Sequence, residues 1–555
     1  MTNRNNNPKK TDRHRIFLLS FLCLFGICLV AQVQPTKKPA KTVKSKVFLL
    51  HSDVLKKSKK NPDPNAQILV GNVAFRHDSI YMYCDSACFY EKTNSLEAFD
   101  NVRMEQGDTL FLYGDYLFYD GNTQIAQVRN NVRMENRTTT LMTDSLNYDR
   151  IANLGYFFEG GTLTDEQNEL SSQWGEYSPA TKMSVFNYDV RLTNPKFVLT
   201  SDTLRYSTAT KIANIVGPSH IDSDQNHIYS ELGFYNTQLG QAELLNRSVL
   251  TNEGKRMTGD SLFYDRVNGV GKAFRNVEML DTIQKNMLRG NYCFYNELTQ
   301  YAFATDKAVA VDFSQGDSLF MHGDTLQLFT YYPQTDSLYR ETRAYHKVRM
   351  FRTDFQAVCD SLVFSSKDSC LTMYRDPILW NKNQQLLGEE VRIYFNDSTI
   401  DWAHIHKQAL SVEKVDTAFY NQISGKDMKA YFHNGDMRQV DVIGSVRLIY
   451  FPMEKDSTLV GMNVSETSEL SMYLVDRKLK RMVMKPKANG TLYPLLELPS
   501  KTHLDNFTWF DYIRPLNKYD IFNWRGKKAD QQLKKSSRSG APSMNQKLLQ
   551  KLMKE

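Results

Sequence analysis

One short motif returns along the chain at an almost constant spacing, and this spacing constrains the fold more than any other feature. The motif is clearest at Thr258–Asp265, which reads Thr-Gly-Asp-Ser-Leu-Phe-Tyr-Asp. A fixed period of this length indicates a repeat architecture, in which neighbouring units share one elongated core. The position of its third residue recurs in steps of 29 to 31 residues, at Asp85, Asp115, Asp144, Gln173, Asp202, Glu231, Asp260 and Asn291.

Each repeat contains two segments in which apolar residues are spaced two apart. The first segment holds Leu and Tyr around a variable Phe, Asn or Arg, and the second holds Val and Met around a charged residue. Such alternation is typical of a β-strand with one buried face, so these pairs are expected to point inward. The Gly and Asp of the motif are expected as turn residues at strand entrances. The inward residues expected are Val102, Met104, Leu117, Tyr119, Val132, Met134, Leu146, Tyr148, Leu204, Tyr206, Leu262, Tyr264, Val277 and Met279.

The segments outside the repeats have distinct compositions. Residues 1–31 read as a secretory signal peptide, with a basic start and an apolar stretch too short to span a membrane comfortably. Residues 32–64 form a basic linker, in which 47–55 could make a first strand. Regular repeats cover 65–296, and looser repeats cover 297–484. Residues 526–555 have the Lys-rich composition of a disordered tail.

Residues 485–525 are rich in aromatic side chains and lack the repeat. This segment could cap the open end of the last sheet, or it could dock on a partner, since aromatic residues and Arg are typical anchors. The sequence leaves both alternatives open. The residues expected to dock are Phe507, Trp509, Phe510, Tyr512, Arg514, Phe522 and Trp524.

The charge is distributed unevenly. The whole chain carries +7, but residues 1–31, 32–60 and 526–555 carry +4, +8 and +6, so residues 61–525 carry −11. An acidic body argues against a nucleic-acid-binding protein, whose basic residues should line the folded surface. The basic ends could contact anionic lipid head groups or simply be solvated.

The chain shows no sequence motif for catalysis. No nucleotide-binding loop, zinc-protease motif or nucleophile elbow is present, and no catalytic residue or cofactor is expected. His404 and His406 share one strand face, but two His residues without a third ligand favour ordinary strand residues over a metal site. Five Cys residues follow the signal peptide, and their odd, sparse set predicts no disulfide framework.

Three short segments carry a resemblance to a known family. Gly71-Asn-Val-Ala-Phe75, Ile80-Tyr-Met-Tyr-Cys-Asp85 and Cys88-Phe-Tyr90 resemble the opening of the OstA-like (LptA-like) family. The resemblance implies an all-β, V-shaped β-jellyroll whose apolar inner groove holds the acyl chains of lipopolysaccharide. It also implies a periplasmic location, end-to-end self-association, and partners among the lipopolysaccharide-transport components, including an outer-membrane translocon.

Two functions remain open at this stage. The inward pairs named above could line an open lipid-binding groove in a transport bridge. They could instead pack as the closed core of a structural or adhesive β-solenoid. Both arrangements require the same alternation of residues, so the periodicity does not separate them.

Overall fold

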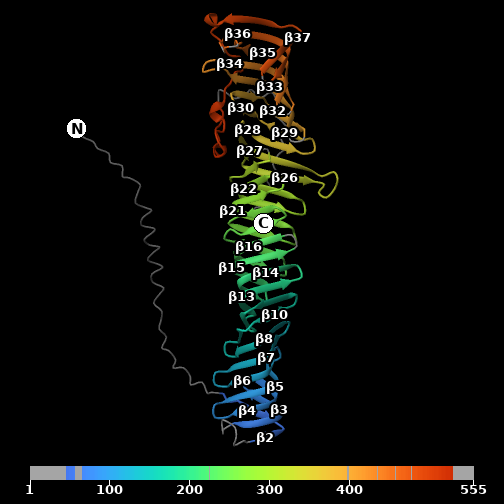
Figure 1. The fold of residues 1–555 in the computed structure, drawn as a ribbon, viewed down its shortest axis with the longest axis vertical. Helices are drawn as coiled ribbons and strands as arrows, with labels where there is room; N and C mark the ends of the chain where they lie inside the picture. The colour runs from blue at the N-terminus through green and yellow to red at the C-terminus, as the bar shows by residue number, and fades with distance from the viewer. Residues whose placement is uncertain are drawn as a thin grey trace, which may run out of the picture.

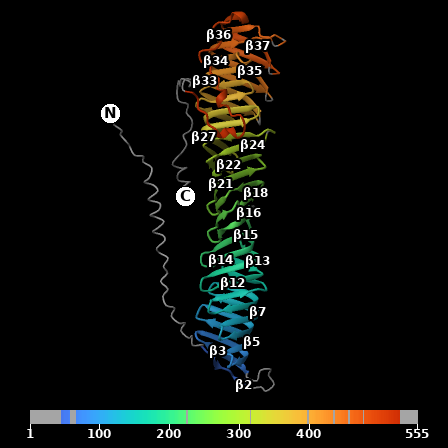
Figure 2. The same cartoon turned by 90° about the vertical axis from the view of Figure 1, so that its left-hand side faces the viewer.

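The computed structural model describes residues 45–56 and 66–528, except for 224–225, 315, 397–398, 434–435, 455, 457 and 477. The expected signal peptide and almost all of the expected tail lie outside these residues. Within the described residues, 38 β-strands form one antiparallel sheet that is wound into a long, narrow stack (Figure 1, Figure 2). The all-β, elongated repeat fold expected from the sequence is therefore confirmed. None of the described helices is long and apolar enough to cross a membrane.

The elements follow one another as a meander of hairpins. The first strands are β1 (Phe48–His51), β2 (Val54–Lys56), β3 (Gln67–His77), β4 (Ile80–Tyr90), β5 (Ser95–Gln106), β6 (Leu110–Asp120), β7 (Ile125–Asn136), β8 (Thr139–Asp149), β9 (Leu154–Phe157), β10 (Gly161–Asp165), β11 (Asn168–Ser172), β12 (Trp174–Ser178), β13 (Met183–Asn194), β14 (Phe197–Ser207), β15 (Ile212–Ser223), β16 (Asn226–Asn236), β17 (Gln241–Leu245), β18 (Val249–Asn252), β19 (Lys255–Thr258) and β20 (Ser261–Asp265). The remaining strands are β21 (Val270–Asp281), β22 (Asn286–Asn296), β23 (Tyr301–Thr305), β24 (Val309–Asp312), β25 (Leu319–His322), β26 (Thr325–Tyr331), β27 (Tyr339–Arg352), β28 (Phe355–Ser365), β29 (Cys370–Tyr374), β30 (Ile378–Asn381), β31 (Gln384–Leu387), β32 (Glu390–Asn396), β33 (Thr399–Lys414), β34 (Tyr420–His433), β35 (Asp436–Tyr450), β36 (Gly461–Val475), β37 (Lys478–Lys485) and β38 (Asn489–Pro494). Three short 3-10 helices come last: η1 (Leu495–Glu497), η2 (Asp511–Ile513) and η3 (Asp520–Phe522).

Most long strands bend in the middle, at a position that we call the corner. In β5, for example, the register with β6 shifts between Phe99 and Val102, and Asp100 and Asn101 have φ angles of 60° and 47°. A β-bulge of this kind bends the strand and sends its two halves into different sheets. Pairs of residues with positive φ recur along the chain, as at Asn130–Asn131, Tyr188–Asp189, Arg275–Asn276, His346–Lys347 and Lys407–Gln408.

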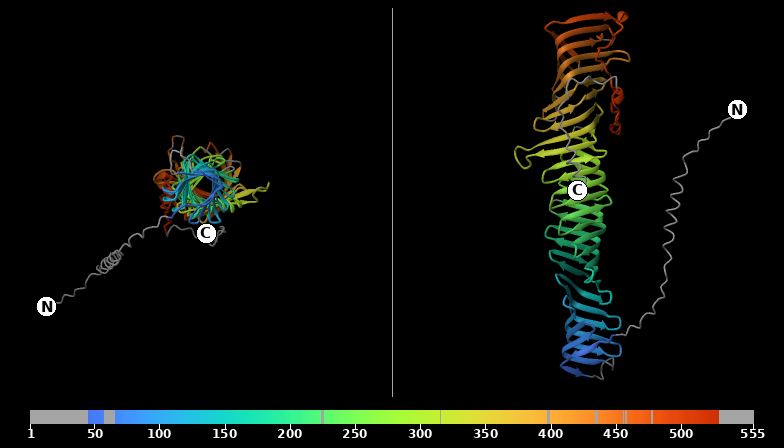
Figure 3. Two further views of the ribbon diagram at one scale, coloured as in Figure 1. Left: turned by 90° about the horizontal axis from the view of Figure 1, so that it is seen from below. Right: turned by 180° about the vertical axis from the view of Figure 1, so that it is seen from behind.

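The corners divide the sheet into two half-sheets that face each other. Where a repeat is split into short strands, β10, β11, β18 and β19 belong to half-sheet A, and β9, β12, β17 and β20 belong to half-sheet B. Viewed along the stack, the strands surround a central axis (Figure 3). With about 4.8 Å between neighbouring strands and roughly 28 strand levels, the stack is on the order of 130 Å long.

The recurrent acidic residue of the motif lies at the corner. Asp115 sits in the middle of β6, so the turn expected at Gly114 and Asp115 is wrong, whereas Gly259 and Asp260 do stand at the entrance of β20. The Asp115 carboxylate accepts a hydrogen bond of 2.6 Å from Nδ2 of Asn131, which lies at the corner of the next strand. The same kind of bond joins the adjacent corners of other repeats. Its further examples are Asn101 to Asp85, Asn246 to Glu231 and Asn276 to Asp260.

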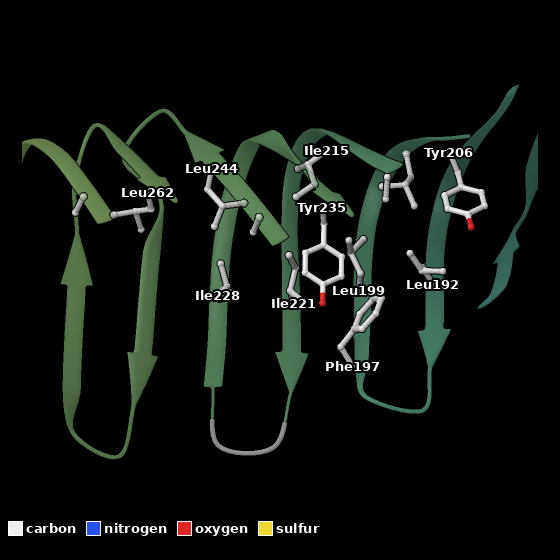
Figure 4. Packing of buried hydrophobic residues seen from close by; sticks show 14 of the residues in the cluster. Leu192, Phe197, Leu199, Tyr206, Ile215, Ile221, Ile228, Tyr235, Leu244 and Leu262 are labelled. Carbon is white, nitrogen blue, oxygen red and sulfur yellow. The ribbon is translucent and has the colours of Figure 1, made fainter. Parts of the chain in front are cut away.

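The inner faces of the two half-sheets form one continuous hydrophobic core, from Val47 to Leu470. In the close-up, Leu199, Tyr206, Ile215 and Tyr235 project from successive strands into the same interior (Figure 4). Burial of these side chains is the main favourable contribution to the stability of the stack. The first strand that the sequence allowed at residues 47–55 is present as β1 and β2, which pair with β3.

Residues 495–528, which we call the strap, run back along the outer face of half-sheet A (Figure 1, Figure 3). Gln385 holds the strap backbone at two points: its Oε1 accepts a bond of 2.7 Å from the Phe510 N–H, and its Nε2 donates one of 2.8 Å to the Thr508 carbonyl. Gln422 makes the equivalent pair of bonds to Leu504 and Thr502.

The strap covers an apolar part of this outer face. Phe510 and Ile513 pack against Trp380 and Ile378, and farther along Ile521 packs in a second cluster with neighbouring strands. Within the expected segment of residues 485–525, β38 pairs with β36 at the end of the stack, whereas the aromatic strap lies along the outer face. The physical reason is that half-sheet A carries apolar side chains on both faces here, and the strap removes the outer ones from water.

The corner ladder generates a prediction about Asn131. Ala at this position has to adopt a φ of 50°, which costs roughly 1 kcal/mol more than for Asn or Gly, and the bond to Asp115 is lost. We expect Asn131→Ala to lower the free energy of local opening of β6–β7 by about 1–2 kcal/mol. Amide hydrogen exchange of these strands measures the change.

The matched control is Asn131→Gly, which also loses the bond but tolerates the left-handed backbone. It should lower protection less than Asn131→Ala does. Unchanged exchange in Asn131→Ala would contradict the role of the corner.

Candidate functional site

The structure places all fourteen residues of the expected inner pairs on the inner face of the stack. Twelve of them are almost completely buried, with exposed fractions of 3% or less. Only Tyr264 and Met279 are partly exposed, at the edge of the same core. Whether lipid binds to any of these side chains stays a prediction.

The two half-sheets meet along a line opposite the corners, which we call the seam. In the N-terminal part of the stack, hydrogen bonds cross the seam once per repeat. Each of the bonds below joins a Tyr at the end of a half-sheet B strand to a polar residue 41 or 42 positions earlier, at the end of a half-sheet A strand. The pairs are Tyr119 with His77 at 2.6 Å, Tyr148 with Gln106 at 3.2 Å, Tyr177 with Asn136 at 3.0 Å, and Tyr206 with Asp165 at 2.8 Å.

The seam is most strongly joined at Asp165. This carboxylate is completely buried and accepts a hydrogen bond from the Tyr206 hydroxyl. Its two oxygens also accept bonds of 2.8 Å and 2.7 Å from the Lys211 ammonium. Burial alone would lower the pKa of Lys211, but its bonds to Asp165 and Glu166 outweigh this and raise the pKa. The paired charges therefore hold the edges together inside a region that excludes water.

The buried Tyr side chains act as neutral hydrogen-bonding groups. Burial raises the pKa of Tyr119 and Tyr148 to about 12, so both remain protonated at physiological pH. A phenol hydroxyl can donate and accept, which lets one Tyr serve His, Gln, Asn or Asp partners across the seam. The sequence showed a recurrent Tyr in these repeats. It did not show the hydrogen-bond partner of each Tyr, which lies about one and a half repeats earlier.

The contacts across the seam change at β16. Tyr235, the next Tyr of the series, packs edge-on against Phe197 with ring centroids 4.7 Å apart. Its hydroxyl makes no hydrogen bond to another residue in the described part of the chain. The cross-seam bonds described above thus lie in the N-terminal part of the stack.

Beyond this point, inner-face apolar side chains become partly exposed. They pack against the main core but are not completely covered, and they come from both half-sheets. Met is frequent among them, and its flexible thioether adapts to irregular apolar surfaces. With the single exception of Leu49, all such residues lie between 250 and 484. They are Leu250, Met257, Tyr264, Met279, Leu288, Ala310, Leu319, Phe355, Phe364, Leu386, Phe395, Ile400, Ile423, Phe432, Met437, Met472, Leu474, Met482 and Met484.

The aromatic residues expected to dock on a partner lie on the strap. Phe510 is completely buried, and Phe507 and Trp509 pack beside Tyr420. Arg514 donates a bond of 2.7 Å from Nε to Gln356 Oε1. The side chains left exposed are Tyr512, Phe522 and Trp524. Docking of a partner on these three stays a prediction.

The cysteines have the character of small core residues. Cys84, Cys293, Cys359 and Cys370 are buried, Cys88 is half-buried, and these five are unpaired. Burial raises the pKa of Cys84 and Cys293 to about 12, so these thiols stay neutral and poorly nucleophilic.

Comparison with known proteins agrees with this geometry. Residues 44–202 and 218–310 match the family described as OstA-like protein. No curated protein matches the sequence significantly.

Among solved structures, one similar chain is LptH from Pseudomonas aeruginosa, described as the LptA homologous periplasmic component of the conserved lipopolysaccharide transport device. The sequence identity is 16% and the TM-score is 0.20. The match covers 21% of this chain and 98% of LptH. This chain is therefore several times longer than the LptH chain.

The 29-residue repeat and the family match both cover the N-terminal part of the stack. This chain is similar to the OstA-like family over residues 44–202 and 218–310.

Proposed function

We propose that this protein is a periplasmic component of lipopolysaccharide transport, and that it takes up the acyl chains of the lipid between its half-sheets in the C-terminal part of the stack. One observation carries the proposal: the partly exposed inner-face residues fall, with one exception, between residues 250 and 484. Similarity to the OstA-like family and the printed description of LptH support the lipid class.

The physical basis is apolar burial. Each CH₂ group removed from water contributes about 0.8 kcal/mol, so an acyl chain lying on several inner side chains is bound without any charged contact. Phe, Leu and Met offer such a surface, and Met adapts its shape to the chain. The sugar and phosphate groups of the lipid remain outside, in solvent.

The N-terminal part of the stack supports a different role for that region. Its inner pairs are packed against each other, and hydrogen bonds cross its seam at Tyr119, Tyr148, Tyr177 and Tyr206. This arrangement suits a structural spacer, which is the alternative function that the sequence left open. Lipid would reach these residues only if the half-sheets separate.

The first test is site-specific photocrosslinking in cells, with a photoreactive residue at Tyr264, Met279 or Leu288. We expect lipopolysaccharide adducts at these positions, because their side chains face the interior and are partly exposed. Adducts at Tyr148 and Tyr206 are expected to be weaker, since both are buried behind the seam.

The controls are the outward neighbours on the same strands. Glu278 adjoins Met279, Arg289 adjoins Leu288, and the two outward side chains form an ion pair on the outer face. Equal adducts at the inward and outward positions, or no lipid adduct at any of the three inward positions, would refute acyl-chain binding on the inner face.

A charge on the inner face should separate lipid binding from folding. Met279 and Met134 occupy equivalent positions in their repeats, but Met134 is 1% exposed and Met279 is partly exposed. We expect Met279→Glu to abolish lipid adducts at Leu288 while lowering stability by only about 1 kcal/mol. Met134→Glu should cost roughly 3 kcal/mol or more, because the carboxylate is buried without a partner.

Thermal unfolding and crosslinking of the two variants provide the comparison. Normal lipid adducts in a folded Met279→Glu protein would argue against the proposed surface.

Both ends of the stack offer edges for self-association. At one end β1 and β2 pair only with β3 among the described strands, and at the other end β37 and β38 pair only with β36. Unpaired edge strands are templates for pairing with another chain. We infer end-to-end assembly, either with a second copy or with another transport component such as the outer-membrane translocon.

Sedimentation velocity over a range of concentrations tests self-assembly. We expect larger species at high concentration, which Leu50→Lys with Leu55→Lys should suppress, since both side chains are exposed on the edge strands. Leu232→Lys, at an exposed position in the middle of the stack, is the matched control. A wild-type protein that stays monomeric at every concentration would exclude pairing between copies.

A further inference from the structure

Three metal-ligand side chains meet on the outer face of β33 and β34. His404 and His406 are two residues apart on β33, and the intervening Ile405 is completely buried in the core, so both imidazoles point outward. Asp427 lies on β34 directly opposite His406 in the strand register. The sequence showed the two His residues but not the third side chain, because Asp427 is 21 positions away.

The three side chains converge on a small volume. Asp427 Oδ1 lies 2.6 Å from His406 Nδ1 and 3.3 Å from His404 Nε2. One ligand atom from each residue lies within 4.8 Å of the others. Ligands bound tetrahedrally at about 2.0–2.2 Å from a zinc ion are separated by roughly 3.3–3.6 Å. The His404 spacing already fits, and a shift of under about 1.5 Å in the imidazoles brings the remaining distances into this range.

We propose that His404, His406 and Asp427 form a binding site for a divalent transition-metal ion of the zinc class. Two imidazoles and one carboxylate are a common ligand set for such ions. The fourth position faces solvent, since the side chains are 21%, 38% and 21% exposed. Water, or a ligand atom from a partner protein, would complete the coordination.

The surroundings hold the ligands in place. The Trp402 ring stacks on Tyr394 with centroids 4.1 Å apart, and the His404 ring lies next in the same row. On β32, Glu390 is opposite His406 and Arg392 is opposite His404, and these two are joined by a bond of 2.7 Å. Packing of this kind fixes the orientation of metal-binding imidazoles.

This cluster departs from the pattern of the repeat. Lys426 stands at the corner, where the equivalent Asp115 or Asp260 accepts a hydrogen bond from an Asn of the next strand, and Asp427 is the residue that follows it. The next corner after Asp427 holds Gly444 and Ser445, neither of which has an amide side chain. Asp427 is paired instead with the two imidazoles of the preceding strand.

A second His–Asp pair in the same chain provides the control. His346 Nδ1 lies 3.5 Å from Asp360 Oδ1, so an imidazole lies beside a carboxylate here too. There, however, Arg375 donates a bond of 2.7 Å to the second Asp360 oxygen. A guanidinium beside the carboxylate repels a cation, so His346 should not bind metal.

The experiment is titration of the chelator-treated full chain with Zn²⁺ by calorimetry, and with Co²⁺ by absorption spectroscopy. We expect one saturable site, a tetrahedral Co²⁺ spectrum without thiolate bands, and affinity at least about tenfold lower in His404→Ala, His406→Ala and Asp427→Asn. His346→Ala should bind like the wild type.

Circular dichroism of each variant separates loss of metal binding from loss of folding. The three side chains lie on the outer face, so we expect their replacement to leave the hydrophobic core intact. Failure of the wild type to bind Zn²⁺ at a saturable site, or binding that persists in a folded His404→Ala, His406→Ala double variant, would overturn the proposal. Neither result bears on lipid binding, which uses the inner face.

Discussion

The two-residue corner in each long strand is the constraint on which the remaining structure depends. Residues such as Asn130 and Asn131 hold positive φ angles, and the strand therefore leaves one half-sheet and enters the other. Without this bend, the meander would form a flat sheet with one face in water. With it, both inner faces meet and one core runs through the stack. Asp–Asn bonds such as that from Asn131 to Asp115 link several neighbouring corners to one another.

Closure of the stack varies along its length, and this variation underlies the two roles that we propose for its two parts. Tyr206, Asp165 and Lys211 join the edges of the half-sheets in the N-terminal part. From Leu250 onward, side chains of the same inner rows are partly exposed. The same alternation of residues thus produces a packed spacer in one region and an accessible apolar surface in another. The difference lies in the residues at strand ends, rather than in the repeat itself.

The sequence predicted the features that depend on local periodicity. The 29-residue period and the inward Leu–Tyr pairs, such as Leu117 with Tyr119, identified the repeat and its buried face because strand alternation is a local property. The seam could not be predicted, since the partner of Tyr119 is His77, 42 residues earlier and across the stack. The position of the strap also depended on distant contacts, such as Gln385 with Phe510. The third ligand beside His404 was missed for the same reason.

The strap gives the stack a mechanical property that its hairpins lack. The strands of the stack lie across its long axis. Tension along that axis would therefore break the hydrogen bonds between neighbouring strands one at a time. The strap instead runs parallel to the axis and is fixed at Gln422, Gln385 and Gln356, which lie two strand levels apart (Figure 2). Axial tension would load these contacts together, in shear. The part of the stack with partly exposed inner residues is therefore the part that carries its own longitudinal brace.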